Sequence, residues 1–280
     1  MCGFLVTPLS FNKEESKKLF DKYVSYRGTI PMSEKDWAGF NFKFARLPIV
    51  DINSFKNQPY IYKNHILVFN GELYNHLEIK TYLQDKLDIE FTTNSDCEVF
   101  LKAFITLGPK KFFKKACGMW AYVISDDEGN IYWGRDEYGI KPLFFKKNES
   151  GYYFSSSQRA LIDCMKKKEI NYKYLRNFLL TGYQNPNLFS FYNNCDLVLP
   201  GYCYSFSKNT NIQEEEFCPF VDNSLENKSL RKIFNEVCES QYPIEVNSSI
   251  ALSGGIDSTA ILHIIKERNL SLNAFSLDLY

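Results

Sequence analysis

Two consecutive strand pairs constrain the fold of this chain more than any other feature of its sequence. "MWAYVISDDEGNIYWGRD" (119–136) and "KPLFFKKNESGYYFSSS" (141–157) each join two apolar runs through a polar turn that contains glycine. This is the pattern of an antiparallel hairpin. Helical patterns precede them in "NKEESKKLFDKYVSYRG" (12–28), with Gly28 as the predicted stop, and in "SDCEVFLKAFITLG" (95–108), where Ser95 and Glu98 form a capping box. Residues 1 to about 205 therefore predict an α+β or layered αβ structure.

The pattern changes after this region. "SKNTNIQEEEFCPFVDNSLENKS" (207–229) is polar and without periodicity, so we expect a linker there. Residues 248–280 then give strand, glycine-rich loop, helix and strand, which is one βαβ unit of a parallel α/β sheet. One such unit cannot bury both faces of a sheet. We therefore predict two domains, 1–208 and 209–280, of which the second is incomplete.

Composition excludes several classes of protein. The chain carries 33 Lys and Arg against 33 Asp and Glu, with no basic block. This balance argues against a nucleic acid or a membrane surface as partner. The 8 cysteines are scattered, and the sequence contains neither a secretory signal nor an apolar run long enough to span a bilayer. We expect a cytoplasmic protein.

A cysteine directly follows the initiator methionine in "MCGFLV". Because residue 2 is small, we expect Met1 to be removed, which would leave the thiol and the α-amine on one residue. A thiol of pKa about 8.5 beside an amine of about 7.7–8.0 is a nucleophile with its own base. The alternative is that Cys2 is only a small apolar residue at the start of a buried strand.

The loop "LSGGIDST" (252–259) lies between an apolar strand and a helix. Glycines let the backbone approach a ligand closely, and the N–H groups at a helix start favour an anion. Hydroxyl groups of Ser253, Ser258 and Thr259 add donors, while Asp257 could orient the loop or contact a metal ion. An ordinary Gly-Gly turn is the alternative.

Five short motifs occur in a fixed order: the N-terminal CG, "FNGELYN", "SDCEV", "RDEYGIKPL" and "LSGGIDS". In this order they resemble the glutamine-dependent asparagine synthetases. The resemblance implies an N-terminal-nucleophile hydrolase domain, a four-layer αββα sandwich. The start of a parallel α/β ATP-pyrophosphatase domain would follow it, since SGGxDS is the fingerprint of that loop.

The resemblance also implies roles for residues of the first domain. Cys2 would attack the side-chain amide of glutamine, and Asn70 and Gly71 would form the oxyanion hole. Asn-Gly is also a hairpin-turn signal, but the segment that follows reads as a helix. Arg46, in "RLPIVD", would bind the glutamine α-carboxylate, and Asp96 assisted by Glu72 the α-ammonium. The remaining glutamine contacts would be Leu47, Pro48, Ile49 and Val50.

For the second domain the resemblance implies a site for ATP. Its residues would be Leu252, Ser253, Gly254, Gly255, Asp257, Ser258 and Leu277, with Asp257 as the one candidate contact to Mg²⁺. ATP would adenylate aspartate, ammonia from glutamine would then displace AMP, and a homodimer is compatible with the family. Two alternatives stay open: the same chemistry on a sugar acid or a β-lactam precursor, or a non-catalytic glutamine-binding protein.

Two stretches depart from the family pattern. The usual RGPD becomes "RGTIPMSEKD", and the usual ASE becomes "SSSQ", with Gln158 in place of glutamate. Both departures leave the nucleophile and oxyanion motifs intact. They leave the amide acceptor open.

Overall fold

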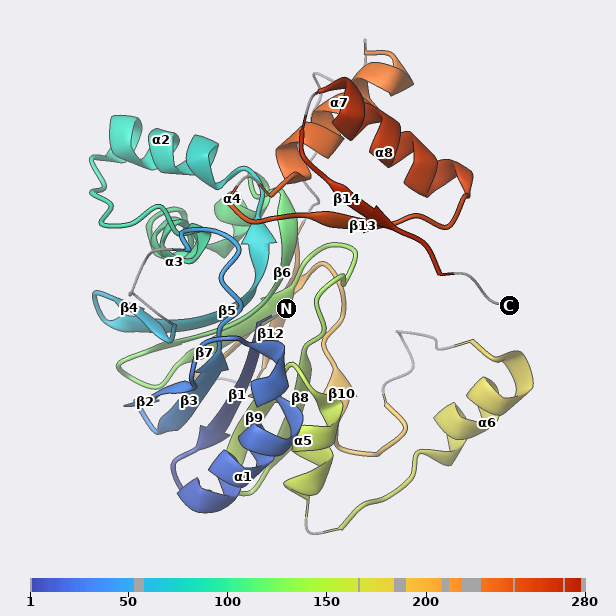
Figure 1. Cartoon of the computed structure of the whole chain (residues 1–280). Helices are drawn as coiled ribbons and strands as arrows, with labels where there is room; N and C mark the ends of the chain where they lie inside the picture. Colours follow the sequence, from blue (N-terminus) through green and yellow to red (C-terminus); the bar gives the residue numbers. More distant parts are fainter. Residues whose placement is uncertain are drawn as a thin grey trace. The chain divides into compact units, whose positions relative to one another are not determined.

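The computed structural model describes residues 2–52, 58–165, 167–183, 190–207, 212–217, 228–243, 245–268 and 270–277. The chain forms two compact units (Figure 1), Met1–Pro48 with Ser54–Phe220, and Ile49–Asn53 with Val221–Tyr280. The domain boundary predicted between 208 and 209 lies outside the described residues and stays a prediction.

The first unit contains two antiparallel sheets. One has the spatial order β10 (Asp196–Leu197), β8 (Phe144–Asn148), β9 (Gly151–Ser155), β1 (Gly3–Pro8), β3 (Phe40–Ala45), β2 (Ser33–Trp37). The other has the order β12 (Gln213–Glu216), β11 (Tyr202–Phe206), β7 (Ile131–Arg135), β6 (Gly118–Asp126), β5 (His65–Leu73), β4 (Tyr60–Tyr62). Both predicted hairpins, β6–β7 and β8–β9, are confirmed.

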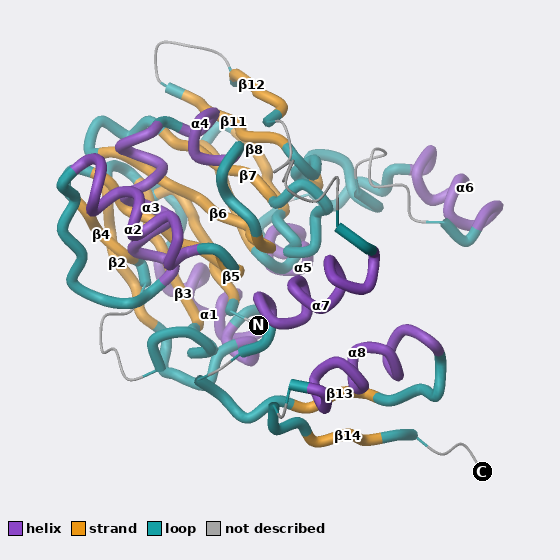
Figure 2. The backbone as a smooth tube through the Cα atoms, turned by 90° about the horizontal axis from the view of Figure 1, so that it is seen from above, coloured by secondary structure: helices purple, strands orange, loops and turns teal. Residues whose placement is uncertain are grey.

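Three apolar clusters separate four layers. The middle cluster, with Phe4, Val68 and Trp133, fills the space between the two sheets. A second cluster packs β5 and β6 against α2 (His76–Leu87), α3 (Asp96–Leu107) and α4 (Pro109–Phe113), and a third packs β1 against α1 (Lys13–Tyr23) and α5 (Gln158–Asp163). Figure 2 distinguishes these strands from the helices beside them. The predicted αββα sandwich is therefore confirmed. The unit also contains α6 (Tyr172–Thr181).

Both predicted helices form, but their ends differ in detail. The first ends at Tyr23, not at Gly28, and a short 3₁₀ turn, η1 (Ser25–Arg27), follows it. At the start of α3, the Ser95 hydroxyl accepts from the N–H of Cys97 as expected of a cap. Glu98 does not complete the capping box, because its carboxylate accepts from the N–H groups of Thr92 and Thr93 instead.

Two further expectations need correction. The helix expected directly after Asn70 and Gly71 begins only at His76, because β5 continues through both residues to Leu73. The predicted linker 207–229 contains a strand, β12, whose exposed Gln and Glu side chains lack apolar alternation. Backbone pairing with β11 is what makes it a strand, and charged residues are typical of such an edge position.

The second unit contains α7 (Leu230–Gln241) and the predicted βαβ segment. Strands β13 (Ser249–Ala251) and β14 (Asn273–Phe275) pair in parallel, and α8 (Ile256–Glu267) connects them. Among the described residues, no helix is both long and apolar enough to cross a lipid bilayer.

Candidate active site

Cys2 lies directly before β1, half-buried against the apolar cluster between the two sheets. The N–H of Leu47 donates to its Sγ over 3.2 Å. Burial raises the pKa of the Cys2 thiol, while this hydrogen bond and the nearby Arg46 guanidinium act in the opposite direction. Met1 lies outside the described residues, so its predicted removal stays a prediction. The thiol is thus held in a fixed position by the backbone that follows β3.

Two buried serines hold β1, the strand that directly follows Cys2. The hydroxyl of Ser155 donates to the carbonyl of Phe4 over 3.1 Å, and the N–H of Ser156 donates to the same oxygen over 3.1 Å. The N–H of Phe4 in turn donates to the hydroxyl of Ser156. The unusual "SSSQ" stretch therefore keeps the two residues that anchor β1, and Gln158 is the first residue of α5.

Asn70 points into the space between the sheets. Side chains of a strand alternate between its faces, and Ile66 and Val68 of β5 belong to the middle cluster whereas Leu67 and Phe69 face the helices. Asn70 therefore shares the face that Cys2 packs against. It is 1% exposed, and its side-chain Nδ2 has no hydrogen-bond partner among the described residues. An unpaired buried donor is costly and calls for a ligand.

The backbone of Gly71 points away from the neighbouring strand β6. Its partner there is Trp120, whose carbonyl and N–H are both bound by Asp136 on the opposite side. In an antiparallel ladder a residue directs both backbone groups to one side. Gly71 and Trp120 thus form a pair without hydrogen bonds, and the N–H of Gly71 is directed to the other edge of β5.

At that edge, side chains form hydrogen bonds with the backbone groups of the residues on either side of Gly71. The amide of Gln58 bonds both the N–H and the carbonyl of Phe69. The carboxylate of Asp96 accepts from the N–H of Leu73 over 3.1 Å. Gly71 lies between these two positions, and its N–H has no acceptor among the described residues. The edge therefore offers one free backbone donor beside the free side-chain donor of Asn70.

Position 71 accepts no side chain. A Cβ built there would lie 2.2 Å from the carbonyl oxygen of Met119 and 2.7 Å from Cα of Trp120. Such contacts with backbone cannot be relieved by rotating a side chain. Glycine at this position is therefore required by the close approach of β5 and β6.

Charged groups surround the thiol. Arg46 follows β3 and Asp96 opens α3, and both are buried. Burial raises the pKa of Asp96 to about 6, although three backbone N–H groups and Arg46 lower it. Burial also raises the pKa of the half-buried Glu72, with the Asp96 charge adding to the effect. The structure thus brings Cys2, Arg46 and Asp96 close enough to influence one another electrostatically, with Glu72 beside Asp96.

The predicted "RLPIVD" contacts are divided between the two compact units. Leu47 and Pro48 belong to the first unit, where Leu47 contacts Cys2. Ile49 and Val50 belong to the second unit. Their predicted contact with glutamine therefore stays a prediction.

Sequence reasoning missed two cations near this site. Arg27 lies against the start of β1, since a Cβ on Gly3 would meet its Cδ at 2.7 Å, and its Nε and Nη1 are buried without a partner among the described residues. Lys141 is buried, and burial lowers its pKa while Glu72 and Cys2 raise it. The sequence did offer a sign of each: Arg27 is the arginine of "YRG" (26–28), and Lys141 is the lysine of "RDEYGIKPL" (135–143).

The "RDEYGIKPL" segment is organised by Asp136. Its fully buried carboxylate accepts from four backbone N–H groups, those of Trp120, Tyr138, Ile140 and Lys141. The guanidinium of Arg135 donates to the carbonyls of Gly139, Lys141 and Val198. The motif therefore fixes the loop that presents Lys141.

In the second unit, the glycine-rich loop joins β13 to α8. Gly254 has φ +79°, with open space around it, and the N–H of Gly255 donates to the Ser253 hydroxyl over 3.3 Å. Ser258 lies 3.2 Å from Ser253 through their hydroxyl oxygens. Leu252 and Leu277 flank the loop, Leu277 being 84% exposed. The described residues contain no cluster of three or more His, Cys, Asp and Glu side chains suited to a metal ion.

Comparison with known families gives a match to the glutamine amidotransferase domain over residues 1–218. The chain belongs to this family. The matched residues include Cys2 and all strands of both sheets. Curated relatives include asparagine synthetase 1 of Bacillus subtilis, 28% identical over 99% of this chain and 46% of that protein. Asparagine synthetase B of Escherichia coli is 30% identical over 83% of this chain and 39% of that protein. The chain spans less than half the length of these relatives.

Solved structures agree on the fold of this amidotransferase domain. A glutamine phosphoribosylpyrophosphate amidotransferase of B. subtilis matches with TM-score 0.53 and 15% identity, over 98% of this chain and 65% of that one. A structure titled as the allosteric regulatory enzyme of purine biosynthesis matches with TM-score 0.56, also at 15% identity. The predicted N-terminal-nucleophile hydrolase fold is therefore confirmed.

Replacement of Asp96 by asparagine is expected to stabilise the domain. A folded-state pKa of about 6, above the ordinary 3.8, means that the folded protein holds this proton more tightly. Stability is therefore lost as pH rises from about 4 through about 6, and Asp96→Asn should regain about 1–3 kcal/mol above that window. Urea unfolding of both proteins at several pH values tests this. If Asp96→Asn were less stable than the parent protein at high pH, burial of the ionised Asp96 carboxylate would not be destabilising.

Proposed function

We propose that this amidotransferase domain hydrolyses glutamine to glutamate and ammonia through a thioester on Cys2. The observation that carries the proposal is a pair of donors, Asn70 Nδ2 and the Gly71 N–H, that have no acceptor among the described residues and lie on the strand whose inner face is directed toward Cys2. Two donors aimed at a developing oxyanion are the expected device for acyl transfer. The N-terminal amine of Cys2 would serve as general base, directly or through a water molecule.

Recognition of glutamine would use opposite charges at its two ends. The buried Arg46 guanidinium can hold the α-carboxylate in a bidentate pair, and Asp96 with Glu72 can hold the α-ammonium. Because the pKa of Asp96 is about 6, we expect affinity for glutamine to fall as pH drops below that value. Lys141 would limit repulsion between the two carboxylates and the thiolate.

Arg46→Ala is expected mainly to raise the KM for glutamine, with kcat reduced less. A carboxylate clamp acts equally on the ground state and the transition state, and its loss removes uniform binding. Loss of one charged pair is worth at least about tenfold in KM. Steady-state kinetics measure both constants, with the exposed Arg159→Ala as control. A normal KM with a large fall in kcat would assign Arg46 to the chemical step.

For the ammonia, we propose an ATP-activated carboxylate as acceptor, with aspartate as first candidate. The glycine-rich loop fits a phosphate group, since Gly254 is surrounded by open space and α8 begins directly after Gly255. Mg²⁺ is often held by one or two carboxylates together with substrate phosphates. Asp257 would therefore be enough as the protein's contact to a Mg²⁺ ion that ATP brings with it. ATP would supply the activation of the acceptor, and the names of the curated relatives favour aspartate.

Asp257→Ala is expected to remove ATP-dependent amide synthesis in the natural gene product while glutamine hydrolysis continues. Cys2 and Asp257 belong to different compact units, so the two half-reactions use separate residues. Both activities are measured on one preparation, with Asp85→Ala, an exposed position on α2, as control. Unchanged amide synthesis would reduce the loop to an ordinary turn.

A glutamine-mimicking diazo ketone tests the glutaminase proposal directly. We expect one equivalent of label on Cys2, identified by mass spectrometry of the peptide, and protection by excess glutamine. The rate at which the preparation releases glutamate should fall in proportion to the fraction of protein that is labelled. Binding of glutamine without label or hydrolysis would instead indicate a non-catalytic glutamine-binding protein.

A further inference from the structure

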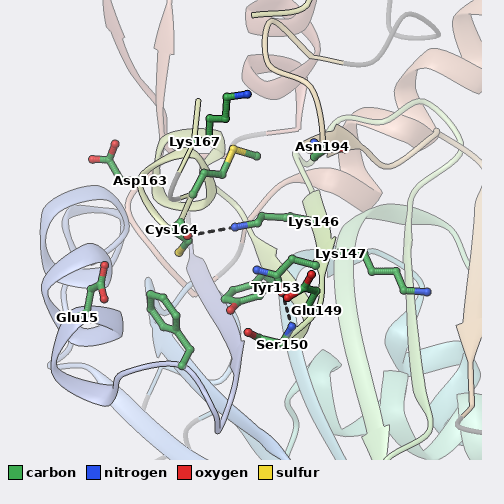
Figure 3. A pocket seen from close by; sticks show the side chains of 13 residues that line it. Glu15, Lys146, Lys147, Glu149, Ser150, Tyr153, Asp163, Cys164, Lys167 and Asn194 are labelled. Carbon is green, nitrogen blue, oxygen red and sulfur yellow. Dashed lines mark hydrogen bonds between the residues drawn. The ribbon is translucent and has the colours of Figure 1, made fainter. Parts of the chain in front are cut away.

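The first unit contains a pocket that lies away from the Cys2 site. It has a volume of about 510 Å³ and is lined by residues of β8, β9, α5 and the segments beside them (Figure 3). Phe11, beyond the end of β1, belongs to its wall, and Ser150 lies in the β8–β9 turn, where Gly151 approaches Pro8. Cys2 precedes the opposite end of β1, so the two sites share no residue.

The distinguishing feature of this pocket is a buried lysine. Lys146 is 4% exposed and donates one hydrogen bond, to the carbonyl of Cys164 over 3.1 Å (Figure 3). Its ammonium also lies 4.9 Å from the centre of the Tyr153 ring. An ammonium has three donors. Among the described residues the other two have no hydrogen-bond acceptor, although the side chain lines the pocket.

No anion of the protein balances this cation in the described part of the chain. Burial lowers the pKa of Lys146, and only the thiols of Cys164 and Cys195 oppose that effect. Burial raises the pKa of both thiols to about 12, so they are neutral at pH 7. Asp163 is bound by Lys168 over 2.6 Å and by Tyr23, while Glu15 and Glu149 are exposed. A buried charge without a partner is unfavourable.

We propose that this pocket binds a small organic anion, a carboxylate or phosphate carried on an apolar body. The anion would pair with Lys146 at the inner end. The apolar body would lie against Phe11, Tyr153 and Met165, of which Phe11 and Tyr153 already form an edge-to-face pair with centroids 5.5 Å apart. The volume is in the range of small-molecule sites. The proposal does not depend on the glutaminase activity.

The contributions of the anionic group and of the apolar body can be measured separately with three compounds: phenyl phosphate, inorganic phosphate and benzyl alcohol. Calorimetric titration of the whole chain is expected to give measurable binding of phenyl phosphate only, with the other two at least about tenfold weaker. Benzoate in place of phenyl phosphate tells whether carboxylate or phosphate is preferred. Equal binding of phosphate and phenyl phosphate would overturn the apolar half of the proposal, and binding of benzyl alcohol as strong as that of phenyl phosphate would overturn the anionic half.

Lys146→Met is expected to weaken phenyl phosphate at least about tenfold, because a charged hydrogen bond is lost. Lys86→Met is the matched control: it removes the same charge from an exposed position on α2 that does not line the pocket, and should change affinity by less than about twofold. Equal losses in both variants would mean general charge attraction and no site. Met165→Trp, which fills the pocket and keeps Lys146, should also abolish binding. Retained binding in that variant would contradict the location even if Lys146→Met failed to fold.

Discussion

Replacement of Cys2 by alanine is expected to abolish glutamine hydrolysis while the domain keeps its fold. The side chain is half-buried directly before a strand, so its loss removes little packing, and the Leu47 N–H is left without the sulfur that accepts from it. Cys97 is the nearest alternative, and it is fully buried with its pKa raised well above the ordinary value. Without the thiol there is no covalent intermediate.

The measurement is glutamate release, with circular dichroism to verify folding. Cys2→Ser should also keep the fold and lose most of the activity, because a hydroxyl is much harder to ionise than a thiol. Cys238→Ala, a half-buried cysteine of the second unit, is the control and should be fully active. The intact mass of the active protein should correspond to a chain that begins at Cys2. Hydrolysis at the normal rate by Cys2→Ala would exclude the thioester mechanism.

Asn70→Ala is expected to lower kcat by about 10²–10³ while KM changes little. The side-chain Nδ2 has no partner in the described structure, which is the condition expected of a donor reserved for a transition state. For the same reason the variant should be as stable as the parent protein or more so, since an unpaired buried donor is removed. A merely structural asparagine would give the opposite result, a loss of stability.

Steady-state kinetics and urea unfolding of one preparation therefore distinguish the two roles of Asn70. Asn193→Ala, at an exposed position in the turn before β10, is the matched control and should alter neither property. A large rise in KM with an unchanged kcat would move Asn70 from the chemical step to ground-state binding. Loss of stability together with loss of activity would indicate that the side chain has a partner in solution.

Local patterns were sufficient for several elements of the first unit. The hairpins β6–β7 and β8–β9 follow from apolar runs around glycine-containing turns, and α3 follows from its Ser95 cap and Gly108 stop. The βαβ segment of the second unit is also read directly from its order of apolar runs. These features depend on neighbours within a few residues, so the local sequence is enough to predict them.

Features that depend on distant backbone were not accessible in this way. β5 continues through Asn70 and Gly71 because β6 pairs with it along its whole length, from His65 to Leu73. The four exposed residues of β12 are a strand only because β11 offers an edge. Glu98 leaves the capping box because the backbone before the helix presents two other donors.

The candidate site divides in the same way. The sequence alone determined which residues are candidates: a cysteine behind the initiator methionine, an Asn-Gly pair, and charged residues whose motifs resemble those of the asparagine synthetases. Only the tertiary structure decided which donors have no partner among the described residues: Nδ2 of Asn70 is buried there without one, and Gly71 faces the strand edge through the pairing of β5 with β6. It also added Arg27, Lys141 and the buried Lys146, which has no counter-charge in the described part of the chain, since burial and the distance to a counter-charge are set by chain segments far apart in the sequence.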